Sequence, residues 1–182
     1  MSLATRRLAF AALAAPALML AGAPEDSTAS YEADVSTSSP AAAVRDEDVM
    51  RNLERVRAVT EKFHDINAAY AAGYPRTVPH CLENPPQGGM GLHYVNSSLL
   101  DDSLDVEHPE ILVYAPTTVG KPKLVRVEYI VPLSEWDREE PPRIFDRDLK
   151  RSESLKIWYL HVWAWEENRN GLFADWNPAV VC

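Results

Sequence analysis

Three histidines and one glutamate could together bind a transition metal. His64 lies in a stretch with helical periodicity, whereas His93 and His161 lie in stretches rich in β-branched and aromatic residues. With Glu128 they would supply three imidazole nitrogens and one carboxylate, a set that suits zinc, copper or non-haem iron. No pair has the short spacing of a metal motif, so the site depends on the fold. We expect a zinc or copper site if the four residues converge, and ordinary polar residues at the margin of the core if they do not.

Strand alternation predicts which residues share a face of the sheet with these candidates. Successive side chains of a strand point to opposite faces, so residues 157–165 separate an aromatic and polar face from an aliphatic one. The first face carries Tyr159, His161, Trp163 and Trp165. In residues 123–133 the same rule separates Arg126 and Glu128 from Val125, Val127 and Tyr129. An alternative to the metal site is therefore a metal-free pocket for a small apolar or aromatic ligand, lined by Arg126, Tyr159 and Trp163.

The elements that must position these residues are one helix and several strands. Apolar residues recur at spacings of three and four over residues 46–72, and Gly73 and Pro75 end the pattern. His64 falls at the edge of the apolar stripe. Strands are expected at residues 92–96, 111–115, 123–133 and 157–165, with irregular chain at 75–91 and a long loop at 132–154. These elements predict an α+β fold in which the helix packs on a curved antiparallel sheet of about four strands. A small, partly open β-barrel with a helix is the alternative.

The N-terminus has the pattern of an export signal. Residues 1–23 combine Arg6 and Arg7, an apolar run at 8–20, and small residues at 21–23. Residues 24–44 are rich in Ser, Thr, Ala, Pro and acids, which predicts a disordered leader, and residues 45–182 fit a single globular domain. The apolar run is too short to cross a bilayer, so no membrane span is expected. We therefore expect a secreted or cell-envelope protein.

The chain has two cysteines, Cys81 and Cys182. In an exported protein a pair without competitors favours a disulfide. Such a bridge would close a loop of roughly 100 residues, for which chain entropy gives an upper figure of about 4.7 kcal/mol of stabilisation.

The net charge and the motifs of the chain argue against some classes of function. The formal charge is −9, and loss of Arg6 and Arg7 with the signal would make the chain more acidic. Nucleic acid is excluded as a partner, because its binding depends on cationic side chains. No arrangement of nucleophile, base and orienting residue can be identified in the chain, which favours binding of a small molecule or metal ion over catalysis. A structural or surface-interaction domain is a third alternative.

Several strings resemble an uncharacterised family of small secreted bacterial proteins. They are FHD at 63–65, GGMGLHYVN at 88–96, VEYIVP at 127–132, LHVWAW at 160–165 and GLFADWNPAVVC at 171–182. The resemblance covers most of the expected domain. It implies export, and it implies no activity, cofactor or catalytic residue.

Overall fold

The computed structural model describes residues 40–78 and 80–182. The expected signal peptide, residues 1–23, and leader residues 24–39 lie outside this range. The first described element is α1 (Pro40–Thr60), so the helix begins at Pro40 rather than at Asp46 and includes the last residues of the expected leader. Within the described ranges, no helix has both the length and the apolar character needed to cross a bilayer.

The expected single helix is divided into three elements. After α1 come the 3₁₀ turn η1 (Glu61–His64) and the short helix α2 (Ile66–Ala71). Asp65 separates the last two, with an extended backbone at φ −87° and ψ 109°, and its carboxylate accepts a hydrogen bond of 3.2 Å from the Asn67 N–H. Asp is a favoured N-cap, so α2 starts as a new helix. This break takes His64 out of the continuous helix on which its expected position depended.

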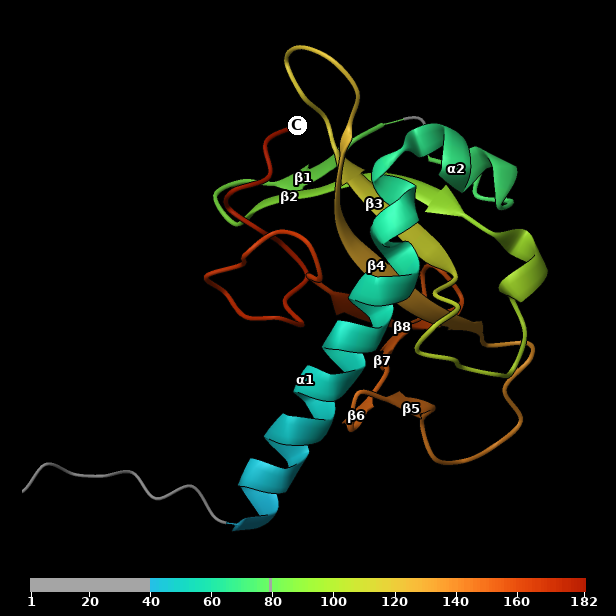
Figure 1. The fold of residues 1–182 in the computed structure, drawn as a ribbon. Coiled ribbons are helices and arrows are strands. Elements are labelled where there is room, and N and C mark those ends of the chain that lie inside the picture. Colours follow the sequence, from blue (N-terminus) through green and yellow to red (C-terminus); the bar gives the residue numbers. More distant parts are fainter. Residues whose placement is uncertain (1–39, 79) are drawn as a thin grey trace, which may run out of the picture. The chain divides into compact units, whose positions relative to one another are not determined.

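A six-stranded antiparallel sheet lies behind the helices (Figure 1). Its strand order is β1-β2-β3-β4-β8-β7, with a separate two-stranded sheet of β5 and β6. The strands are β1 (Leu82–Asn84), β2 (Gly88–Val95), β3 (Ile111–Ala115), β4 (Lys123–Pro132), β5 (Arg143–Ile144), β6 (Arg147–Asp148), β7 (Lys150–Ser152) and β8 (Ile157–Val162), and the 3₁₀ turn η2 (Ser97–Leu99) follows β2.

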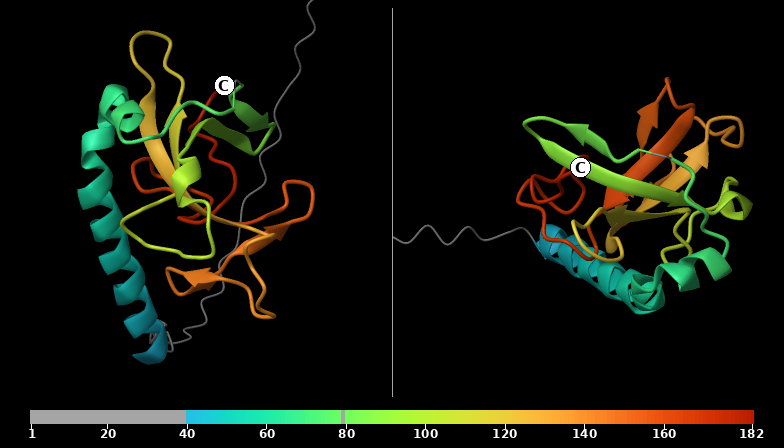
Figure 2. Two further views of the ribbon diagram at one scale, coloured as in Figure 1. Left: turned by 90° about the vertical axis from the view of Figure 1, so that its right-hand side faces the viewer. Right: turned by 90° about the horizontal axis from the view of Figure 1, so that it is seen from above.

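The α+β class with a curved antiparallel sheet is confirmed, although the sheet has more strands than expected. The expected strands correspond to β2, β3, β4 and β8, and the sheet gains the short edge strands β1 and β7. β1 lies in residues 75–91, where irregular chain was expected, and β7 lies in residues 132–154, where a long loop was expected. Seen from above, the sheet curls into a half-barrel whose open side faces away from the helices (Figure 2).

The two faces of the sheet carry different side chains. The helix-covered face holds the main apolar core, with residues such as Leu53, Val56, Phe63, Leu112, Tyr114, Val127, Tyr129 and Leu160. A smaller apolar cluster occupies the concave face: Ile111, Val113, Val125, Ile130, Trp163 and Val180.

Two of the expected side-chain placements were wrong. A β-bulge sets Val113 opposite Arg126 and Tyr114 opposite Leu124, so Val125 is the extra residue and joins the concave face. Trp165 lies beyond the end of β8, where strand alternation no longer applies. It packs on the helix side and donates a hydrogen bond of 3.0 Å to the Thr60 hydroxyl.

The C-terminal segment, residues 166–182, is held against β2. Gly89 and Asn177 exchange two backbone hydrogen bonds of 3.1 Å, and the expected disulfide joins Cys81 to Cys182 with a Cα–Cα distance of 5.5 Å. Gly88 has a φ of +108°, and a Cβ at this position would lie 2.1 Å from the Asn177 carbonyl oxygen. Only glycine permits this approach. The disulfide prediction is therefore confirmed, and the glycine run serves the docking of this segment.

Glu110, just before β3, is a buried carboxyl with a backbone partner. It is 2% exposed, and Oε2 accepts a hydrogen bond of 3.0 Å from the Ile130 N–H. Burial raises the pKa of Glu110 from 4.5 to about 8, although the hydrogen bond acts in the opposite direction. The folded protein therefore holds this proton at neutral pH, whereas the unfolded chain releases it near pH 4.5.

The contribution of Glu110 to stability should accordingly be complete below pH 4.5 and should be lost as the pH rises to about 8. The expected slope is at most about 1.4 kcal/mol per pH unit, because one proton is involved. Glu110→Gln should remove this part of the pH dependence in urea unfolding. The exposed control Glu139→Gln should retain it. An identical pH profile for wild type and Glu110→Gln would contradict the assignment.

Candidate functional site

Four polar side chains meet on the concave face of the sheet, and we call them the ion cluster: His93 from β2, Arg126 and Glu128 from β4, and His161 from β8. Strand register brings them together, since Glu128 pairs directly with His161, and Val113 of β3 pairs with both His93 and Arg126. None is more than 6% exposed. The cluster is therefore withdrawn from water and has to satisfy its polar atoms internally.

Glu128 is the centre of these contacts. Its Oε1 lies 3.0 Å from His93 Nε2 and 3.6 Å from His161 Nε2, and it accepts a hydrogen bond from Arg126 Nη2. Arg126 Nη1 donates a bond of 3.0 Å to the Asp175 carbonyl, and its guanidinium lies 4.9 Å from the centre of the Trp163 ring. The C-terminal segment thus supplies the acceptor for Arg126 Nη1, which the strands do not provide.

Burial and charge set the protonation states. Burial by itself would raise the pKa of Glu128. The positive charge of Arg126, together with the nearby imidazoles of His93 and His161, outweighs this effect and lowers that pKa well below its usual range. Burial lowers the pKa of His161, against the opposing effect of Glu128. At neutral pH the cluster therefore consists of a guanidinium–carboxylate pair with a neutral His161 beside it.

A cavity of about 260 Å³ lies over the ion cluster. His93, Glu128 and His161 form its polar floor, and Ser152 and Tyr159 add two hydroxyl groups. The remaining lining is apolar: Val78, Leu82, Met90, Val95, Ile111, Leu155 and Ile157. Leu82 comes from the edge strand β1, and Ser152 comes from the opposite edge strand β7, so both ends of the sheet contribute to one cavity.

The expected metal ligands are only partly assembled. His93, Glu128 and His161 meet, whereas His64 is exposed on η1 and packs against Trp165 with ring centres 4.3 Å apart. Over residues 40–78 and 80–182, no group of three or more His, Cys, Asp or Glu side chains has the arrangement needed to hold a metal ion.

Of the three expected pocket residues, one lines the cavity and two do not. Tyr159 lines the cavity, as the alternation in β8 indicated. Arg126 lies beneath the floor as the partner of Glu128. Trp163 stacks on Arg126, and its indole N–H donates a hydrogen bond of 2.7 Å to the Ala174 carbonyl. The apolar walls and Asp175 were not anticipated.

Asp175 connects the C-terminal segment to His161. Its Oδ1 lies 3.2 Å from His161 Nδ1, a close electrostatic contact without the alignment of a hydrogen bond, and it accepts a bond of 2.6 Å from Lys150 Nζ. The His161 contact and the Lys150 bond lower the pKa of Asp175 to about 2, against the opposing effect of burial. Asp175 lies outside any strand, so no periodic signal in the sequence could have located it.

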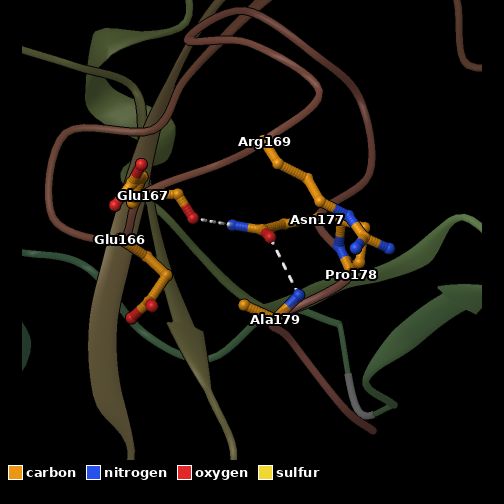
Figure 3. Close-up of a pocket in the computed structure, with 6 residues that line it drawn as sticks. All are labelled: Glu166, Glu167, Arg169, Asn177, Pro178 and Ala179. Carbon is orange, nitrogen blue, oxygen red and sulfur yellow. Dashed lines mark hydrogen bonds between the residues drawn. The ribbon is translucent and has the colours of Figure 1, made fainter.

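A second hollow lies between the C-terminal loops and is lined by Glu166, Glu167, Arg169, Asn177, Pro178 and Ala179 (Figure 3). The buried Asn177 amide donates to the Glu167 carbonyl and accepts from the Ala179 N–H, both at 2.9 Å (Figure 3). These bonds satisfy the side chain with backbone partners, so Asn177 holds the loops together and offers little to a ligand.

Comparison of the chain with protein-family models, curated proteins and solved structures returns no match. The functional argument therefore comes from the geometry of the site.

Arg126→Met should destabilise the protein by about 3–5 kcal/mol, because it leaves the Glu128 carboxylate buried without its main partner. A second change, Glu128→Leu, should restore much of that loss, because it removes the unpaired charge. Urea unfolding of the single and double variants measures both effects.

The control is Arg138→Met, which breaks an exposed pair with Asp102 at 3.0 Å and should change stability by about 0–1 kcal/mol. An equal, small loss in Arg126→Met and Arg138→Met would show that the buried pair has no special role.

Proposed function

We propose that the protein is a small-molecule-binding module, with the cavity over the ion cluster as its binding site. The observation that carries the proposal is an apolar-walled cavity with His93, Glu128 and His161 converging at its floor. Binding sites for small molecules commonly combine apolar walls with a few well-placed polar groups. The volume of about 260 Å³ lies near the lower end of their range, which favours a compact ligand.

The position of the ion cluster also supports binding. A buried ion pair is often less stabilising than apolar side chains of the same volume, because both charges lose their hydration. Stability alone therefore does not explain Arg126 and Glu128 at the centre of the sheet. Their location directly beneath a cavity fits a role in orienting the polar end of a bound molecule.

Zinc or copper binding by the same residues stays a prediction with less support. His93, Glu128 and His161 are adjacent, but Arg126 already contacts Glu128 Oε1, the carboxylate oxygen that both imidazoles face. A second positive charge at that oxygen would be repelled by the guanidinium.

If a metal does bind there, saturating zinc should raise the melting temperature of the wild type and not that of His161→Ala. Metal at about 100 times its dissociation constant contributes about 2.7 kcal/mol by mass action. Equal shifts in the two proteins, or no shift in either, would count against the metal site.

An extracytoplasmic location is part of the proposal. The Cys81–Cys182 disulfide is compatible with an oxidising compartment, and the signal-like pattern of residues 1–23 supports export. Membership of a secreted bacterial family stays a prediction from the resemblance alone.

Two uncharged probes, para-propylphenol and para-propylanisole, should test the binding function by calorimetric titration. At least one should bind, and Leu155→Asp should weaken it about tenfold, because a charge replaces an apolar wall at the partly open end of the cavity.

Leu155 is 68% exposed, so its substitution should leave the fold intact. The matched control is Val119→Asp, at a position that is 88% exposed and does not line the cavity, and it should bind like wild type. Binding by neither probe, or equal weakening in both variants, would favour a structural or surface-interaction domain.

A further inference from the structure

The protein contacts of the Glu128 carboxylate leave one of its oxygens unused. Among the described residues these contacts run through Oε1, which faces Arg126 Nη2 and the Nε2 atoms of His93 and His161. Arg126 Nη2 donates to Oε1, and the two imidazoles crowd the same oxygen. Glu128 lines the cavity, and its Oε2 keeps the capacity to accept hydrogen bonds from a ligand.

The proton position on His93 follows from its contact with Arg126. Nε2 accepts a hydrogen bond of 3.3 Å from Arg126 Nη2, a group that can only donate, and Nε2 also lies 3.0 Å from Glu128 Oε1. The ring proton is then on Nδ1. That atom is buried and has no hydrogen-bond partner among the residues that the structure describes. His93 therefore offers no lone pair to a ligand.

The tautomer of His161 is determined by two carboxylates. Nδ1 lies 3.2 Å from Asp175, whereas Nε2 lies 3.6 Å from Glu128 Oε1, too far for a hydrogen bond. The neutral ring is thus favoured with its proton on Nδ1 and its lone pair on Nε2. Because burial lowers the pKa of His161, this neutral form dominates at neutral pH.

The donors of Arg126 are directed away from the cavity. Arg126 uses Nη2 for Glu128 and His93 Nε2, and it uses Nη1 for the Asp175 carbonyl. Its Nε has no hydrogen-bond partner among the described residues, but Arg126 does not line the cavity. The hydroxyls of Ser152 and Tyr159 belong to partly exposed side chains, where water competes for their hydrogen bonds.

We infer that the cavity selects uncharged alcohols or phenols, whose hydroxyl group donates a hydrogen bond to the acceptors Glu128 Oε2 and His161 Nε2. This inference rests on the proposed binding function. An ammonium group would meet the guanidinium of Arg126 next to the same carboxylate, and an anion would be repelled by that carboxylate. A neutral donor avoids both penalties and pairs with acceptors to which no described residue donates.

The two titration probes test this preference on the wild-type protein, because para-propylphenol and para-propylanisole share one skeleton and differ in the O–H donor. At pH of about 7, where the phenol is uncharged, the phenol should bind at least about tenfold more tightly, since the ether leaves the acceptors unpaired. Equal affinities, or tighter binding of the anisole, would overturn the inference while leaving the binding function intact. Failure of both probes to bind would instead contradict the binding function.

Two variants locate the preference within the cavity. His161→Phe keeps an aromatic ring but removes the Nε2 acceptor, and the ratio of the two affinities should fall towards one. Tyr159→Phe removes a hydroxyl from the same cavity while leaving both acceptors in place, so it should keep the wild-type ratio. A fall in Tyr159→Phe with no change in His161→Phe would assign the preference to the tyrosine and overturn the inference. If His161→Phe does not fold, the wild-type ratio and the Tyr159→Phe ratio still decide the question.

Discussion

Arg126 and Glu128 are both charged and both withdrawn from water, and this pair sets requirements that the surrounding structure has to meet. Each buried charge loses several kcal/mol of hydration, which only close and complete pairing can offset. The partners come from three separate parts of the chain: His93 on β2, His161 on β8 and a carbonyl of the C-terminal segment. A slip of β4 by one residue would turn the pair towards the apolar core under the helices. The ion pair therefore constrains strand register as well as the site.

The C-terminal segment supplies the contacts that complete the ion cluster on the sheet. It contributes no named strand, yet it provides a carbonyl to Arg126 and a carboxylate to His161 from the single residue Asp175. Its placement depends on the close backbone approach at Gly88 and on the bond between Cys81 and Cys182. The same bond adjoins Leu82, a wall residue of the cavity. The attachment of the C-terminal segment at Gly88 and Cys81 therefore both covers the buried charges and helps to shape the cavity.

The sequence allowed prediction of those features that depend on local periodicity. The four longer strands, the main helix and the shared face of Arg126, Glu128 and His161 follow from spacing, and the disulfide follows from the cysteine count. Tertiary contacts determine the rest. The helix breaks because the Asp65 side chain caps a new helix, and a bulge at Val125 changes the face of one valine. The edge strands β1 and β7 are too short for alternation to identify, and each exists through pairing with a longer neighbour.

The order of the chain separates the strands from the segment that covers their charged residues. All the strands of the described residues end by Val162, whereas the segment that contacts Arg126 and His161 follows them. The strands can pair with one another without this segment, but Arg126 then lacks the Asp175 carbonyl and keeps water in its place. Docking of the C-terminal segment therefore removes water from a pair of opposite charges and carries a desolvation cost that apolar burial does not.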